Sequence, residues 1–234
     1  MNIGEIFGDS LGYPFRNIKA LVLYVVLGII VGLLGGTTIL TTALAMFSKG
    51  ALSFTFAGLG IVGLIVTIIV VLLIDGYALD IVKFGIERRE DGPGIDIGRQ
   101  VVNAIKLVIV DIVYYVVPII IAIVLGLFLR NWIMIIISII LFFVFTFADL
   151  MAHCRLAKTD SLGDALAIGD IGRVGVGKLI ISLILIAFIL FIIALIVAFL
   201  ITLNSTIGAI VFGFAAVYYV FFYNRVIGLL YSDV

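Results

Sequence analysis

The sequence predicts an all-α fold, a polytopic transmembrane helical bundle of about six spans. Of its 234 residues, 65% are hydrophobic and 12% are charged, and the mean hydropathy is +1.44. A soluble domain has roughly 25% charged and 45–50% apolar residues, so the bilayer is the solvent that suits this chain. The long apolar runs also lack the alternating polarity of barrel strands, which leaves helices as the spanning elements.

Six runs are long and apolar enough to cross a bilayer as helices, which takes about 20 residues each. They cover residues 18–46, 52–73, 101–129, 132–150, 179–203 and 207–230. The first run contains Gly35-Gly36-Thr37-Thr38 near its middle. The helix is expected either to kink there or to end and leave a short interfacial piece.

Basic residues are concentrated on one side of the predicted spans. Twelve of the 14 lysines and arginines fall on the side that holds both chain ends, and the other side has only Lys49 and Arg130. The positive-inside rule therefore predicts a multi-pass protein of the cytoplasmic cell membrane with both termini in the cytoplasm. An even number of spans agrees with this topology.

Two segments on the predicted cytoplasmic side are expected to form short amphipathic helices in the membrane interface. One is the N-terminus, where Ile3, Ile6, Phe7 and Leu11 keep helical spacing. The other is the segment 160–178, which opens with the capping-box pattern "SLGD" at 161–164.

An internal repeat is expected within a single integral membrane domain, residues 1–234. The motif "DIGR" occurs at 96–99 and again at 170–173, each time before a span. The predicted units are three helical hairpins, residues 1–86, 87–159 and 160–234.

Asp111 lies inside the apolar run "LVIVDIVYYVVP", where a carboxylate is costly and often functional. Helical spacing places it on one face with Gln100, Ala104, Tyr115 and Pro118, and that face is expected to point into protein. Asp111 then either joins helices by a hydrogen bond or takes part in transport or catalysis. We expect its partner to be a tyrosine hydroxyl or a polar group from an inner helix end.

The inner ends of the even-numbered spans supply further polar groups at a depth similar to that of Asp111. The candidate intramembrane polar site consists of Asp111, Tyr115, Asp75, Asp80, Asp149, His153, Arg155 and Arg225. One interpretation is a polar pocket that faces the cytoplasm. The other is that these are ordinary helix ends at the headgroup level, where long basic side chains reach the polar interface.

Small residues recur at spacings that allow close helix approach. The predicted helix-packing positions are Gly28, Gly32, Gly36, Gly58, Gly63 and Gly213. For six helices in one chain, contacts within the chain are expected before contacts between copies.

Several kinds of site are not expected. A single histidine, His153, and an isolated cysteine, Cys154, argue against a zinc or haem site built from this chain alone. No nucleophile and base stand together, and "GIDIGRQ" and "GRVGVGK" lack the context of a phosphate-binding loop. We therefore predict no metal, no cofactor, no nucleotide and no catalytic residue, and the balanced charge gives no sign of a nucleic-acid partner.

Four stretches, "YPFRNIK", "GYALDIVKFG", "GPGIDIGRQ" and "YYVVP", resemble an uncharacterised prokaryotic membrane family. This family is the domain of unknown function numbered 4013, which is common in methanogenic archaea. The resemblance implies a multi-span protein of an archaeal cytoplasmic membrane with no assigned activity, and it transfers no functional residue.

Three functions remain open from the sequence. The first expectation is a non-enzymatic protein that organises the membrane or binds a partner. The alternatives are a transporter for a small or lipid-like solute with Asp111 in its path, and an intramembrane lipid-modifying enzyme. The expected partner is the lipid bilayer, and a homo-oligomer or another membrane protein is left open.

Overall fold

The computed structural model describes residues 1–47, 50–129, 131–167 and 175–232, and in this part of the chain every regular element is a helix. The elements are α1 (Ile3–Gly12), the 3-10 helix η1 (Tyr13–Asn17), α2 (Ile18–Phe47), α3 (Ala51–Ile86), α4 (Ile97–Gly126), α5 (Asn131–Thr159), α6 (Leu162–Leu166), α7 (Val176–Leu203) and α8 (Ser205–Tyr231).

The predicted fold class is confirmed, because six helices are long and apolar enough to cross a membrane. The helix α2 continues through Gly35 and Gly36 to Phe47, so the first span does not end at these glycines. The helices α3 and α5 run well past the apolar stretches that predicted them, to Ile86 and Thr159. Hydropathy marks the part of a helix that lies in lipid, and these helices continue beyond it.

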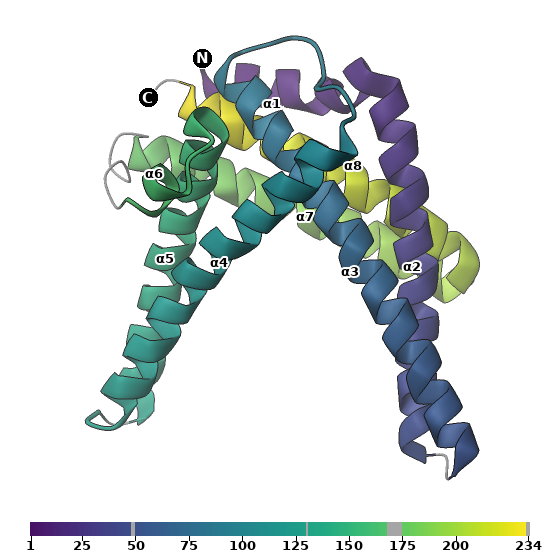
Figure 1. Cartoon of the computed structure of the whole chain (residues 1–234). Helices are drawn as coiled ribbons and strands as arrows, with labels where there is room; N and C mark the ends of the chain where they lie inside the picture. The colour runs from purple at the N-terminus through teal and green to yellow at the C-terminus, as the bar shows by residue number, and fades with distance from the viewer. Residues whose placement is uncertain (48–49, 130, 168–174, 233–234) are drawn as a thin grey trace.

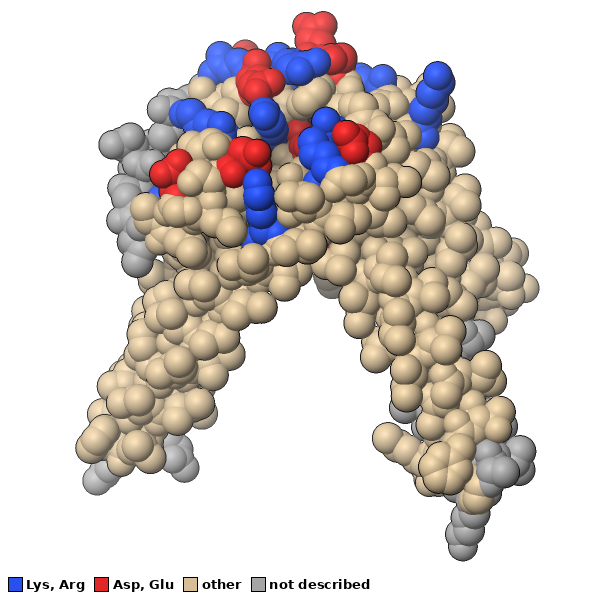
Figure 2. Space-filling view, in the orientation of Figure 1, with Lys and Arg blue, Asp and Glu red and all other residues tan. Residues whose placement is uncertain are grey.

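Two helical hairpins diverge from one end of the molecule (Figure 1). The pairs α2/α3 and α4/α5 form the two arms of an inverted V, and α7 and α8 cross behind them. Both chain ends, α1 and α6 lie at the apex, where the visible charged side chains also gather (Figure 2). The arms expose large apolar side chains such as Ile61, Ile123 and Ile139, which suits a charged apex at the membrane surface and arms within lipid.

The helix α8 joins the α2/α3 arm to α7 through contacts with all three helices. Gly28 and Gly32 of α2 lie against Gly213 and Ala209 of α8. A Cβ atom added at Gly213 would lie 2.5 Å from the Ile29 backbone nitrogen, so the helices approach backbone to backbone.

The other glycines agree only in part with the predicted helix-packing positions. Gly58 was predicted to pack against a helix, but a Cβ atom there would meet open space. Gly63 is buried, and the surroundings of Gly36 lie outside what the structure describes. Sequence analysis overlooked Gly76, which packs on the Gln100 backbone, because it is a single glycine without a repeat of small residues around it.

The helix α1 forms where it was predicted, and it is fixed to the bundle. Asn2 and Glu5 make a reciprocal capping box at its start, with an Asn2 Oδ1 to Glu5 backbone nitrogen distance of 2.8 Å. Ile6 and Ser10 are fully buried, and α1 contacts α8. The apolar stripe predicted to face lipid therefore faces protein at Ile6.

The second interfacial helix is much shorter than predicted. The helix α6 spans Leu162–Leu166, with Ser161 Oγ accepting a hydrogen bond from the Asp164 backbone nitrogen at 3.3 Å, and it ends at Ala167, which is extended. Residues 168–174, which include the second "DIGR", lie outside the described residues. In the first copy, Asp96 caps the start of α4. That the three hairpins are repeats stays a prediction.

Candidate functional site

A cavity of about 390 Å³ lies among α3, α4, α5, α7 and α8. Its size falls within the range of small-molecule pockets, about 300–1,000 Å³. Most of its wall is aliphatic or aromatic. The polar groups on the wall are Asp75, Asp111, Tyr115, Thr146, Asp149, His153, Tyr223 and Asn224. The cavity therefore combines an apolar wall with a small group of titratable side chains.

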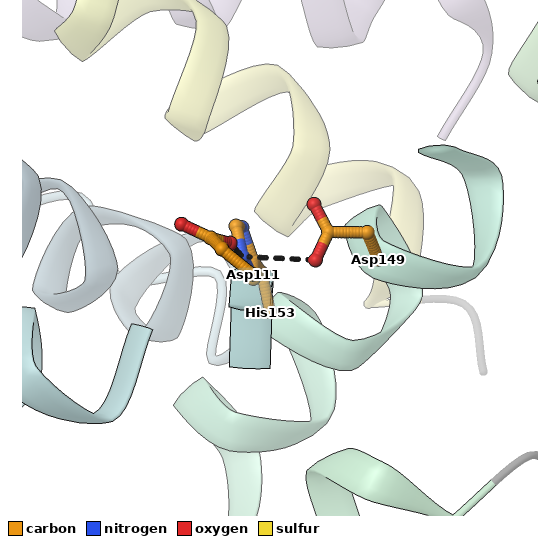
Figure 3. A group of neighbouring side chains, drawn as sticks. All are labelled: Asp111, Asp149 and His153. Atoms are coloured by element: carbon orange, nitrogen blue, oxygen red, sulfur yellow. Dashed lines mark hydrogen bonds and ion pairs between the residues drawn. The ribbon is translucent and has the colours of Figure 1, made fainter. Parts of the chain in front are cut away.

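Asp111, Asp149 and His153 form the centre of this polar group (Figure 3). His153 Nε2 lies 2.7 Å from Asp111 Oδ1 and 3.5 Å from Asp149 Oδ1. Asp111 comes from the middle of α4, whereas Asp149 and His153 stand one turn apart on α5. The partner of Asp111 is thus a side chain just past the inner end of the fourth predicted span, residues 132–150.

The cavity wall has more acidic than basic side chains. Asp75 interacts electrostatically with both Asp111 and His153, so three carboxylates surround one imidazole. Even a protonated His153 would balance only one of the three. A charge within a membrane normally has a partner because leaving it uncompensated is costly. The arrangement therefore favours protons or a bound cation.

Charges at the apex, by contrast, are paired with one another. Lys106 Nζ lies 2.6 Å from Asp160 Oδ1, and Arg89 Nη2 lies 2.6 Å from Asp91 Oδ2. The hydrogen bond from Arg89 holds the pKa of the Asp91 carboxyl below its usual value. These apex carboxylates thus have basic partners, whereas the described residues that line the cavity include no lysine or arginine.

Asp111 is accessible from outside the bundle. Its side chain is 40% exposed, whereas that of Asp149 is 8% exposed. Val108 and Tyr115 line the cavity and are also exposed, so the opening lies along α4. Asp111 therefore lies nearer the opening than Asp149.

The structure divides the eight predicted polar-site residues among four places. Asp75, Asp111, Tyr115, Asp149 and His153 line the cavity. The other three do not, and each has a partner in another part of the bundle.

Asp80 lies beside the start of α4, where its carboxylate accepts hydrogen bonds from Arg99 Nε at 3.1 Å and Asn103 Nδ2 at 3.0 Å. Arg155 Nη2 donates to the Tyr114 hydroxyl and to the Ala165 carbonyl, both at 3.2 Å. These contacts tie α3 to α4 and α5 to α6. Asp80 and Arg155 were therefore wrongly grouped with Asp111.

Arg225 is also outside the cavity, although it was predicted to belong to the same site. Its Nε donates to Asp9 Oδ2 at 2.7 Å and its Nη1 to the Phe84 carbonyl at 3.1 Å. The guanidinium lies over the Tyr13 ring at 4.3 Å from the centroid. Arg225 thus fastens α1 and η1 to α3 and α8.

Sequence analysis missed Thr146 and Tyr223 as lining residues. Thr146 precedes Asp149 by three positions and His153 by seven, a helical spacing that places all three on one face. That spacing was available in the sequence. Tyr223 is an aromatic residue in an apolar run, and nothing local separates it from lipid-facing neighbours.

Three groups of metal-ligating type meet in the cavity. One ligand atom each from Asp111, Asp149 and His153 lie within 4.8 Å of one another. The expectation of no zinc or haem site rested on the presence of one histidine and one isolated cysteine in the chain. It did not include a carboxylate supplied by a different helix.

This arrangement defines a polytopic helical membrane protein with a polar cavity inside the bundle. The chain belongs to the family described as "Protein of unknown function (DUF4013)", whose model matches residues 59–203. The resemblance drawn from the sequence motifs is thereby confirmed. Asp75, Asp111, Asp149 and His153 all fall inside the matched range, whereas α1, α2 and α8 fall outside it. Neither a comparison with curated proteins nor one with solved structures gave a match.

Proposed function

We propose that this protein is a membrane carrier that binds a small cationic solute in the cavity beside Asp111. The observation that supports the proposal is the surplus of carboxylates on the wall of a cavity among five membrane-crossing helices. Ionisable groups inside such helices are typical of ion and proton paths. Asp111 lies at the opening and Asp149 deeper, so a cation has a sequence of two partners on entry.

His153 gives this site a means to exchange a proton for the cation. Imidazole changes charge near neutral pH more readily than other side chains. With His153 neutral, the carboxylates attract a cation, and with His153 protonated, the cation competes with a positive charge 2.7 Å from Asp111. Cation release coupled to proton uptake follows from this competition.

A membrane-organising or partner-binding protein was the first expectation from the sequence. The exposed apolar arms and the two short helices at the apex agree with it. It gives no role, however, to a cavity with three carboxylates, since a scaffold is more stable without unbalanced buried charge.

An intramembrane lipid-modifying enzyme is the second candidate. His153, held between two carboxylates beside an opening bordered by apolar side chains, supplies acid and base groups that sequence analysis did not find. Turnover of lipid by the purified protein, followed by mass spectrometry and lost in His153→Gln, would favour the enzyme over the carrier.

We further propose that the protein lies in the cytoplasmic membrane with its charged apex, and therefore both termini, inside the cell. In the sequence, twelve of the 14 basic residues fall on the side of the predicted spans that holds both termini, which supports this orientation. A cysteine replacing the exposed Ser205, at the connection between α7 and α8, should react with a membrane-impermeant maleimide in intact cells. A cysteine replacing Ser161 should react only after the cells are opened, and the reverse pattern would refute the orientation.

Thiol chemistry inside the cavity tests the carrier directly. Thr146 is exposed and lines the cavity, so Thr146→Cys should react with a cationic methanethiosulfonate reagent in membranes. The carboxylates should raise the local concentration of the cationic reagent, and we expect a rate about tenfold above that of an anionic reagent of similar size. The native Cys154 is fully buried and should add little background.

Val144→Cys is the matched control for this experiment. Val144 lies two positions from Thr146 on α5 and is 50% exposed, but it does not line the cavity. The two positions lie at nearly the same depth but on opposite faces of α5. A difference between the reaction rates of the two cysteines therefore reflects the cavity and not the depth. Equal rates at the two cysteines, or no preference for the cationic reagent at Thr146→Cys, would rule out a cation-accessible cavity.

A further inference from the structure

We infer that Asp111, Asp149 and His153 bind one divalent transition-metal ion. This inference rests on the proposed function and names the class of its solute. It arises from three features of the cavity: the spacing of the ligand atoms, a buried carboxylate oxygen without a hydrogen-bond partner, and the charge and chemistry of the three groups.

The spacing fits a shared ion. Metal bonds to imidazole nitrogen and carboxylate oxygen are about 2.0–2.2 Å long, which places neighbouring ligand atoms of a tetrahedral or octahedral ion roughly 3.0–3.5 Å apart. The distances from His153 Nε2 to Asp111 Oδ1 and Asp149 Oδ1 are 2.7 Å and 3.5 Å. Small side-chain movements would therefore place all three ligand atoms on one ion.

Asp149 supplies an independent sign of a missing ligand. Its side chain is 8% exposed, and its Oδ1 atom has no hydrogen-bond partner among the described residues. Figure 3 shows this carboxylate directed at His153, and the 3.5 Å separation from Nε2 is too long for a good hydrogen bond. A buried carboxylate oxygen without a partner is costly, and a metal ion would satisfy it.

The charge and chemistry of the ligands select the ion. Two carboxylates and a neutral imidazole carry a charge of −2, which a divalent ion balances. Imidazole beside carboxylate suits Mn²⁺, Fe²⁺, Co²⁺, Ni²⁺ or Zn²⁺ better than Ca²⁺ or Mg²⁺, which prefer oxygen ligands alone. Cys154 is not in the group, so no soft thiolate favours Cu⁺.

The site leaves room for exchange. Three protein ligands do not complete the coordination of these metals, and the adjoining cavity of about 390 Å³ has space for water at the remaining positions. Closed structural sites, by contrast, use four protein ligands. An ion held by three side chains at the edge of an accessible cavity can be bound and released, as a carrier requires.

Metal binding by the full-length protein in detergent, with a purification tag free of histidine, tests the inference. We expect one Co²⁺ per chain by equilibrium dialysis, with visible absorption bands of a nitrogen- and oxygen-ligated ion. Asp149→Asn and His153→Gln should each weaken Co²⁺ binding by at least about tenfold, since each removes a ligand. Asp164→Asn changes an exposed carboxylate on α6 outside the cavity and should leave binding unchanged.

A second measurement needs no substitution. His153 is the only histidine in the chain, so diethyl pyrocarbonate modifies that imidazole alone. We expect Zn²⁺ to slow this reaction in the wild-type protein and Mg²⁺ to leave it unchanged. Absence of stoichiometric Co²⁺ binding, or of Zn²⁺ protection, would overturn the inference. If metal binding were absent but Thr146→Cys still reacted preferentially with the cationic reagent, the carrier proposal would survive and only the metal would be wrong. If metal binding and the preference for the cationic reagent were both absent, the carrier proposal and the metal site would both be rejected.

Discussion

Gly213→Val should destabilise the bundle by about 1–3 kcal/mol, the usual cost of forcing extra carbon atoms into a packed interface. Gly213 of α8 lies on α2, and even a single Cβ atom there would stand 2.5 Å from the Ile29 nitrogen and 2.6 Å from its Cα. Backbone atoms cannot rotate away as a flexible side chain can. The helices must therefore separate, and α2 would lose its contact with α8. Unfolding in detergent, followed by circular dichroism, measures the loss.

Gly58→Val is the matched control, because Gly58 also lies within a long membrane-crossing helix but has open space where its Cβ would be. Replacing glycine with valine slightly favours a helix, so the control should stay within about 0.5 kcal/mol of the wild-type protein. If Gly213→Val were as stable as Gly58→Val, the close crossing of α2 and α8 would be incorrect.

The spans were predictable because hydropathy depends on local composition alone. A run of about 20 apolar residues must be a helix in lipid wherever it packs. The direction in which a glycine faces is not local, which explains why Gly28 and Gly213 meet whereas Gly58 faces open space. The predicted length of the second interfacial helix was wrong for a related reason. The capping residue Ser161 marks where α6 begins, but it does not indicate where the helix ends.

The candidate site was predictable in part. Helical spacing placed Asp111 on one face with Gln100, Ala104, Tyr115 and Pro118, and that face was expected to point into protein. Gln100, Ala104 and Pro118 are buried, but the Asp111 side chain is 40% exposed and Tyr115 is also exposed, so the expectation holds only for part of the face. Asp80, Arg155 and Arg225 were grouped with Asp111 because they were expected at a similar depth in the membrane. Depth, however, does not give the direction in which a side chain points around its helix. His153 follows Asp111 by 42 positions and comes from another helix. A single sequence does not show which faces of two helices meet.

Asp111→Asn should abolish or strongly reduce cation movement while leaving the fold intact. Asparagine keeps the size and hydrogen-bonding capacity of the side chain and removes its charge. Interactions with charged groups contribute about 1.5–3 kcal/mol each, so cation binding should weaken by roughly tenfold or more. Asp111 is half-buried at the cavity opening. When the His153 imidazole is neutral, removing the charge of Asp111 leaves no unpaired charge on His153. We therefore expect little change in the free energy of unfolding.

Charge displacement in proteoliposomes on a solid-supported membrane measures whether the cavity carries a cation across the membrane. Concentration jumps of H⁺, Na⁺, K⁺, guanidinium and Mn²⁺ are applied in turn to wild type, Asp111→Asn and the control Asp164→Asn. We expect a transient current for at least one of these cations in wild type and Asp164→Asn, and a current about tenfold or more smaller in Asp111→Asn. Wild-type protein without a current for any of them, or Asp111→Asn with a current equal to that of wild type, would contradict it.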